Sequence, residues 1–189
     1  MASRLLAIAV LAAGGLVLKN QLKKNQGSGR MSSTTESIEV DVPVSTAYNQ
    51  WTQFEDFPSF MAGVHEVRQL DDTHLRWRAD VGGKPESWDS EITEQVPDRV
   101  IAWRSTSGAR NEGRVTFQRV SDTRTRIDLR IDYEPRGMVE RLGDAVGAVS
   151  MRAKGNLERF KQFLEHRGAE TGAWRGRVSQ GREMSASTS

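Results

Sequence analysis

The sequence predicts an α+β domain in which a curved antiparallel sheet of about seven strands wraps around one long C-terminal helix. Two observations predict this fold class. Between residues 64 and 133, short stretches of alternating apolar and polar residues follow one another, separated by turn sequences. Between residues 138 and 166, apolar residues instead recur every three or four positions, which is the spacing of one helix face. Strands joined in series by tight turns pair antiparallel, so the helix is left to cover one face of the sheet.

The length and composition exclude several kinds of site. At 189 residues the chain has the length of one domain with extra segments at its ends, and such a chain can bury a core without cross-links. It contains no Cys, which excludes disulfides, a thiolate nucleophile and Cys-based metal sites. Its three His residues, His65, His74 and His166, match no metal-ligand spacing, and no glycine-rich phosphate loop is present. We therefore predict no metal and no other cofactor.

The formal net charge of +2 hides an uneven distribution. Residues 1–30 contain Lys and Arg but no acidic residue, and residues 167–189 are also basic, so the middle of the chain is acidic. A domain that binds duplex nucleic acid carries its basic patch on the folded body. The distribution therefore argues against nucleic acid as a partner.

Residues 5–18 form an uninterrupted run of apolar residues and glycine with cations on both sides. As a helix the run would span about 21 Å, which is short for a bilayer core of about 30 Å. Three interpretations remain open for residues 1–19: a short membrane anchor, a secretory signal, and a misplaced start upstream of Met31. We favour the anchor, and the larger number of cations after the run predicts a cytoplasmic domain. The alternative is a soluble cytoplasmic protein that starts at Met31.

Two further segments have the composition of flexible chain. Residues 20–35 are polar and rich in Gly and Ser, which predicts a flexible linker. Residues 169–189 are similar and are predicted to be a disordered tail, with Trp174 as a single incidental aromatic. The folded domain is therefore expected to span residues 36–168.

The first elements of that domain are a strand and a pair of short helices. Residues 37–44 alternate in strand fashion, with Ile38 and Val40 on one face. Pro43 ends this strand, and Ser45 is a good N-cap for a helix that continues to about residue 53. A second short helix or turn is expected around Pro58.

The strands of the meander are bounded by Gly, Pro, Asp and Asn turns. They are expected at residues 64–70, 73–81, 86–96, 99–105, 112–120 and 123–133. Within the second of these, Leu75, Trp77 and Ala79 share one face, whereas Arg76 and Arg78 share the other. The last strand alternates in the same way, so one face of the sheet is apolar and the other is charged and solvated.

The apolar face carries large aromatic residues, and the helix opposite begins with small ones. Two interpretations are open: the two sets interlock as an ordinary core, or they line a pocket whose ligand fills the remaining volume. The pattern alone favours the ordinary core. If a pocket exists, its predicted lining residues are Trp77, Trp88, Trp103, Phe117, Tyr133, Leu142, Val146 and Val149.

Three segments resemble a known superfamily. They are residues 88–105, WDSEITEQVPDRVIAWRS, the segment Gly113–Phe117 that follows Gly108, and residues 38–61 with their Phe-Pro-Ser-Phe at 57–60. Over residues 36–167 the chain is similar to the START-like polyketide cyclase/dehydrase and lipid transport superfamily, near the coenzyme-Q-binding START-like proteins. The resemblance implies the helix-grip fold with a hydrophobic cavity between sheet and C-terminal helix. It also raises the pocket interpretation above the ordinary core.

Two functions follow as hypotheses. The resemblance implies either a carrier of a quinone, lipid or polyisoprenoid, or a polyketide-type cyclase or dehydratase. The apolar run at residues 5–18 would tether such a carrier to a membrane. Cyclisation needs a positioned acid and base, and the sequence offers only weak candidates. Glu94 could act as an acid or base if it faces inward, and His65 could lie at a pocket mouth, but water-exposed positions are expected for both. We therefore predict no catalytic residue and favour the binding function.

Overall fold

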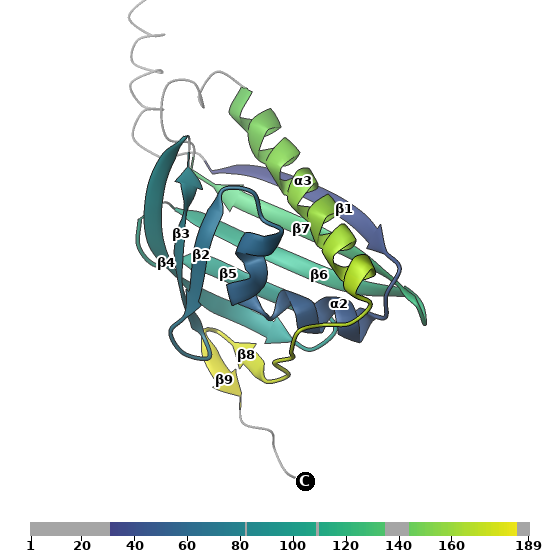
Figure 1. Cartoon of the computed structure of the whole chain (residues 1–189). Helices are drawn as coiled ribbons and strands as arrows, with labels where there is room; N and C mark the ends of the chain where they lie inside the picture. The colour runs from purple at the N-terminus through teal and green to yellow at the C-terminus, as the bar shows by residue number, and fades with distance from the viewer. Residues whose placement is uncertain (1–30, 82, 109, 135–143, 185–189) are drawn as a thin grey trace, which may run out of the picture. The chain divides into compact units, whose positions relative to one another are not determined.

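The structure of the protein, a computed structural model, describes residues 31–81, 83–108, 110–134 and 144–184. Figure 1 shows α3 (Asp144–Arg167) lying across one face of a curved antiparallel sheet. The short helix α2 (Val44–Trp51) and the 3-10 helix η1 (Phe54–Ser59) cover the same face. The predicted α+β architecture, a curved sheet around a C-terminal helix, is confirmed.

The main path of the sheet has the strand order β1-β7-β6-β5-β4-β3-β2. Its strands are β1 (Ser32–Val40), β2 (Val64–Gln69), β3 (His74–Val81), β4 (Lys84–Val96), β5 (Val100–Ser105), β6 (Asn111–Ser121) and β7 (Arg124–Tyr133). Every pair along this path is antiparallel. The register shifts in β4 between Ile92 and Glu94, and in β6 between Arg119 and Ser121. Such bulges bend a strand and increase its twist, which helps the sheet to curve.

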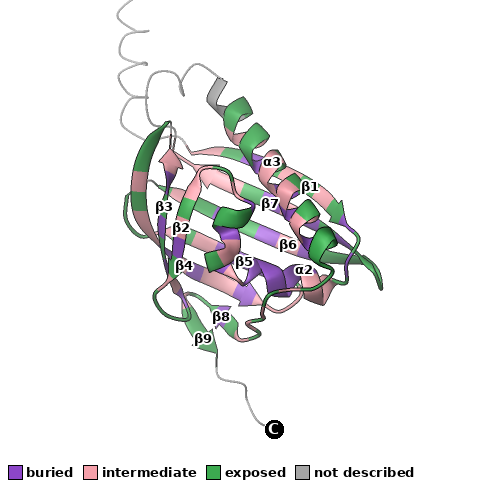
Figure 2. Cartoon of the chain, viewed as in Figure 1, coloured by how far each residue is buried: buried purple, intermediate pink, exposed green. Residues whose placement is uncertain are grey.

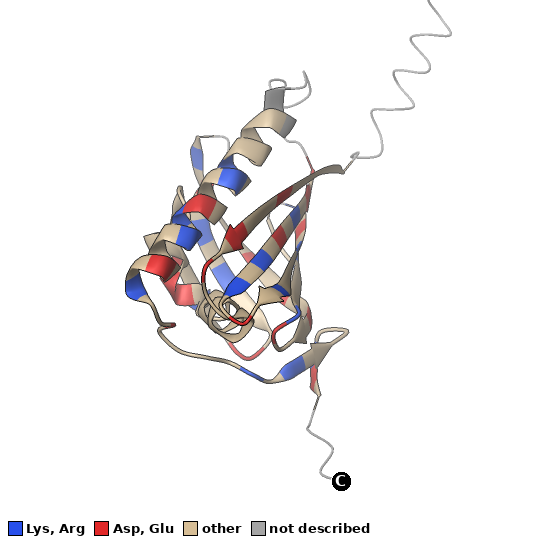
Figure 3. Ribbon diagram, turned by 90° about the vertical axis from the view of Figure 1, so that its right-hand side faces the viewer, with Lys and Arg blue, Asp and Glu red and all other residues tan. Residues whose placement is uncertain are grey.

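The alternation of the strands places their faces as predicted. Leu75, Trp77 and Ala79 of β3 are buried, and Ile127 and Leu129 of β7 are buried in the same way (Figure 2). The intervening positions of β3 and β7 are mostly Arg and Asp and are exposed or half-buried, so they lie on the opposite face. Figure 3 colours these charged positions along the ribbon. Across β3 and β4, for example, Arg76 Nε lies 2.8 Å from Asp89 Oδ1. Exposed pairs of this kind contribute about 0–1 kcal/mol each, so the buried face accounts for most of the stability.

The predicted turn at Asp71-Asp72 is present between β2 and β3. The carboxylate of Asp71 accepts hydrogen bonds from the backbone N–H groups of Thr73 and His74, both at 2.8 Å. The bond from the Thr73 N–H is the main reason that the pKa of Asp71 falls to about 2. The side chain therefore holds the two strands in their hairpin register.

Two expectations for the start of the domain are wrong. Residues 32–35, predicted to be part of a flexible linker, belong to β1 and pair with residues 130–133 of β7. Their polar side chains do not prevent this, because the edge of β7 supplies backbone hydrogen-bond partners. Ser45 is also not the N-cap of α2: the helix begins at Val44, and Pro43 at the N-cap makes no side-chain capping bond. The Pro43 carbonyl accepts the first helical bond, from the N–H of Ala47 at 3.1 Å.

The described part of α3 has the predicted buried stripe. Ala153, Leu157, Phe160 and Leu164 are all buried against the sheet and the short helices. The helix ends as predicted at Gly168, whose φ is +71° and whose N–H bonds to the Leu164 carbonyl at 2.9 Å. The expected helix start at residue 138 lies outside the described residues.

The prediction of a disordered tail is wrong for residues 169–184. This segment forms β8 (Arg177–Ser179) and β9 (Arg182–Met184), and β8 pairs with Glu94 and Gln95 of β4. Val178 is buried, and Trp174 packs against the core. Although few of its residues are apolar, the segment is ordered because those few fill positions that the rest of the chain leaves open.

Candidate ligand-binding pocket

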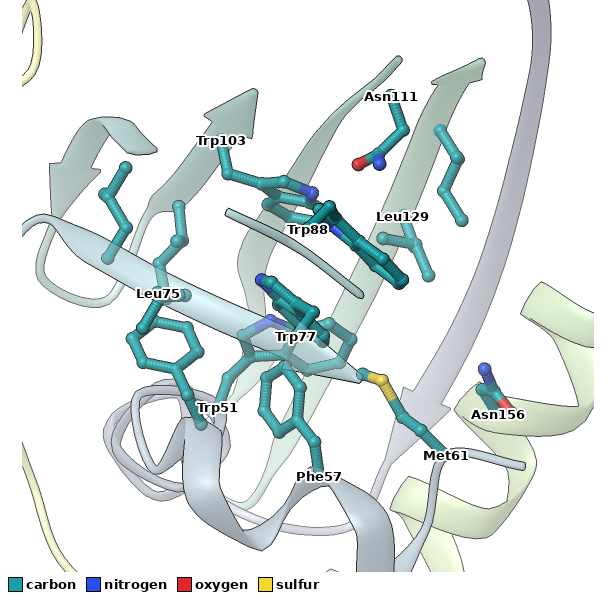
Figure 4. Close-up of a pocket in the computed structure, with 14 residues that line it drawn as sticks. Trp51, Phe57, Met61, Leu75, Trp77, Trp88, Trp103, Asn111, Leu129 and Asn156 are labelled. Atoms are coloured by element: carbon teal, nitrogen blue, oxygen red, sulfur yellow. The ribbon is translucent and has the colours of Figure 1, made fainter. Parts of the chain in front are cut away.

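A pocket of about 160 Å³ lies between the sheet, η1 and α3 (Figure 4). Its wall is almost entirely apolar and aromatic, with two carboxamides as its polar side chains. The lining residues are Trp51, Phe54, Phe57, Met61, Leu75, Trp77, Trp88, Ile92, Ile101, Trp103, Asn111, Leu129, Ile131 and Asn156. Small-molecule sites typically combine such an apolar wall with a few polar groups that fix orientation.

Two stacked indoles form one side of the pocket. Trp77 and Trp88 lie directly opposite each other in β3 and β4, with ring centroids 5.9 Å apart and parallel planes. The indole N–H of Trp77 donates to the hydroxyl of Ser90 at 2.8 Å, and Ser90 is fully buried. Because the polar edge of Trp77 is satisfied inside the protein, the indole can form part of an apolar wall without an unpaired N–H group.

The third indole depends on a glycine. Trp103 of β5 pairs with Gly113 of β6, and its ring lies over that residue. A Cβ at position 113 would come within 2.6 Å of Trp103 Cη2 and closer still to Cε2 and Cζ2. Only glycine leaves the space that the ring occupies, so Gly113 positions this part of the wall.

The remaining side of the pocket is formed by α3 and the segment that follows η1. Figure 4 shows Met61 and Asn156 beside each other at this end of the pocket. Asn156 accepts a hydrogen bond from the N–H of Ala62 at 3.1 Å, and the guanidinium of Arg159 donates to the Phe60 carbonyl at 2.9 Å. Side chains of the helix therefore hold the segment that carries Met61.

The predicted lining residues divide into three groups. Trp77, Trp88 and Trp103 line the pocket. Phe117 is buried beside it against Tyr48 and Trp51, with centroid distances of 5.6 and 6.1 Å, and is not one of the lining residues. Tyr133 and Val149, both partly buried, are likewise not lining residues. Leu142 lies outside the described residues, as does the side chain of Val146.

Sequence reasoning missed the contribution of the short helices and of Asn156. Trp51, Phe54 and Phe57 form an edge-to-face aromatic cluster at the base of the pocket. The spacing of the Phe residues around Pro58 was a signal that this turn is buried. No sequence signal marks Asn156, because a lone polar residue on a helix is usually exposed.

The ionisable groups considered as catalysts do not lie on the pocket wall. Glu94 is paired with Arg114, and both side chains are more than a third exposed. His65 lies 3.1 Å from Asp80, with both side chains again well exposed. None of the described lining residues is ionisable. Across the described ranges, no group of three or more His, Cys, Asp or Glu residues is arranged to hold a metal ion.

The predicted membrane anchor, residues 1–19, lies outside the described residues. In the described part of the chain, no helix is long and apolar enough to cross a membrane.

A curved antiparallel sheet closed by a C-terminal helix over an apolar pocket defines a helix-grip domain of the START-like class. The chain belongs to the polyketide cyclase / dehydrase and lipid transport family, which it matches over residues 40–162. It is 52% identical over 149 residues to an uncharacterised 17.2 kDa protein of Streptomyces lincolnensis. The aligned region covers 78% of this chain and 99% of that protein.

Two solved structures show the same fold at low sequence identity. One is the ZhuI aromatase/cyclase from a Streptomyces species, with 17% identity and a TM-score of 0.64, covering 77% of this chain and all of that one. The other is a START superfamily protein from Mycobacterium smegmatis, with 16% identity and a TM-score of 0.56, covering 71% of this chain and 95% of that one. At such identities the likeness is one of fold, and it leaves the ligand open.

Proposed function

We propose that this domain binds and carries an apolar small molecule, of the quinone, lipid or polyisoprenoid kind, in the pocket between sheet and α3. The observation that supports this most is the wall itself, which has four indoles, no ionisable side chain among its described residues and only two carboxamides. An apolar cavity of about 150 Å³ is large enough to hold benzene. A pocket of about 160 Å³ therefore accommodates one ring-sized group, and a longer chain would extend beyond it.

A cyclase or dehydratase acting on a polyketide-like substrate is the second candidate. It is favoured by the likeness in fold to an aromatase/cyclase structure. Acid–base catalysis would require a titratable group within hydrogen-bond reach of the substrate, directly or through one water. The described wall offers none, so the binding function is the better supported of the two.

Filling the pocket should weaken binding without unfolding the domain. Ile131 lines the pocket, so Ile131→Phe places extra carbon atoms in ligand space. We expect the affinity for 1,4-benzoquinone, followed by quenching of tryptophan fluorescence, to fall about ten-fold. The melting temperature should change little, because a pocket accepts added volume.

A matched control comes from the same strand. Ile127 is fully buried and does not line the pocket, so Ile127→Phe should overpack the core and cost ~1–3 kcal/mol. Its affinity for the quinone should stay close to that of the wild type. Because the chain has no Cys, a change in fluorescence on adding the quinone cannot result from alkylation of a thiol. A wild-type protein that binds neither the quinone nor a lipid would rule the proposal out.

We also propose that residues 5–18 tether the domain to a membrane, on the grounds of their uniform apolarity and flanking cations. The full-length chain should then sediment with membranes, whereas a chain that starts at Met31 should remain in the supernatant. Recovery of the full-length chain in the soluble fraction would contradict the tether.

A further inference from the structure

The side chain of Asn156 has a fixed orientation at the pocket. Its Oδ1 accepts two hydrogen bonds, from the backbone N–H of Ala62 at 3.1 Å and from Arg159 Nη2 at 2.5 Å. Arg159 is itself held in place, because its Nε donates to the Phe60 carbonyl at 2.9 Å. Turning the amide over would place its NH₂ group against these two donors. The carbonyl end of Asn156 must therefore face Ala62 and Arg159.

The opposite end of the amide is a hydrogen-bond donor that has no acceptor among the residues that the structure describes. Within the described residues, Asn156 Nδ2 donates to no protein atom. Asn156 also lines the pocket, at the end where Met61 lies (Figure 4). The pocket therefore presents an N–H group whose direction is set by the other half of the same amide.

We propose that Asn156 Nδ2 donates a hydrogen bond to an oxygen acceptor on the ligand, so that the pocket selects apolar molecules carrying a carbonyl-type oxygen. This inference rests on the proposed binding function and narrows its ligand class. A ring-sized group with a ketone or quinone oxygen satisfies the donor. A pure hydrocarbon leaves the Asn156 N–H group unpaired. A ligand with only a donor group at that point places two donors against each other, which disfavours binding.

A pair of nearly isosteric probes tests the selection. Acetophenone carries a C=O group where α-methylstyrene carries C=CH₂, and each has one ring, which suits the volume of the pocket. Because a hydrogen bond in such a site changes affinity by about five-fold, the wild-type protein should bind acetophenone about five-fold more tightly. Dissociation constants of both probes would be measured by NMR titration of the full-length chain. This comparison needs no variant and so does not depend on a variant folding.

The variant Asn156→Asp then tests which group makes the selection. A carboxylate can still accept from Ala62 and Arg159, but it turns an acceptor towards the pocket in place of the donor. The preference for acetophenone should disappear or reverse in this variant. The control is Gln162→Glu, which makes the same amide-to-carboxylate change at an exposed position of α3 and should keep the five-fold preference.

The possible outcomes separate this inference from the function on which it rests. Equal affinity of the wild type for both probes would overturn the donor role of Asn156 and leave the pocket as a binding site. A preference that survives unchanged in Asn156→Asp would overturn it too, because another group would then make the selection. Binding of neither probe would overturn both the inference and the proposed function.

Discussion

Replacing Gly113 with alanine is expected to destabilise the domain by ~1–3 kcal/mol and to weaken binding in the pocket. The added Cβ would overlap the ring of Trp103, which lies across Gly113 from the neighbouring strand. The nearest atoms belong to the rigid indole, so the whole ring must turn away. The added methyl group would block movement of the Trp103 indole towards β6. The indole would therefore move into the pocket that it lines.

The direction of this effect is informative. Glycine is unfavourable inside a strand, so an alanine at an unconstrained strand position would stabilise the protein. Gly147→Ala is the matched control, because a Cβ there meets nothing within 4 Å and lies on an exposed part of α3. That change should stabilise the protein by up to ~1 kcal/mol.

Urea denaturation measures the loss of stability in Gly113→Ala, and titration with 1,4-benzoquinone measures the loss of affinity. Combining it with Trp103→Leu should recover part of the lost stability, because the shorter side chain no longer meets the added methyl group. Gly113→Ala with wild-type stability and wild-type affinity would show that the indole can move at no cost, and that Gly113 does not position it.

Removing residues 169–189 should lower the free energy of unfolding by at least ~3 kcal/mol. The deletion exposes the core surface now covered by Val178 and Trp174. It also removes the bidentate pair between Arg175 and Asp98, with distances of 2.7 and 3.0 Å. The fully buried Gln50 would lose its bonds to the backbone N–H and hydroxyl of Thr171. Thermal melting in the presence and absence of the tail measures the loss.

Smaller changes distinguish the contribution of the tail from a general effect of shortening the chain. Val178→Ser should reproduce part of the loss, since it places a hydroxyl in a buried apolar position. Removal of residues 185–189 alone shortens the chain beyond β9 and should leave the melting temperature unchanged. If a chain that ends at Gly168 had the same melting temperature as the full-length protein, the tail would not contribute to stability.

The elements of the main sheet could be predicted because their signals are local. In β3, the alternation of Leu75, Trp77 and Ala79 with Arg76 and Arg78 is enough to define a strand with one buried face. The stripe from Ala153 to Leu164 likewise defines the buried side of α3. Strands of this kind, joined by short turns, leave few arrangements other than an antiparallel meander covered by the helix.

The order of the C-terminal tail could not be predicted, because it depends on contacts distant in the chain. Residues 169–184 have too few apolar side chains to fold alone, which is the usual reason for predicting disorder. They are ordered because β4 offers free backbone groups at Glu94 and Gln95, and because Val178 and Trp174 reach the core. The composition of a segment does not indicate whether a strand edge or a core surface elsewhere in the chain will bind it.

Three features could be inferred from the sequence: the fold class, the inward-facing indoles Trp77, Trp88 and Trp103, and the absence of Cys chemistry. Each of these follows from residue type and from spacing over a few positions. The form of the pocket depends on contacts made in the folded chain: Trp103 lies over Gly113, and Ala62 and Arg159 orient the Asn156 amide. Volume and hydrogen-bond direction are properties of side chains brought together by folding, so a sequence pattern can indicate a pocket but cannot give its shape.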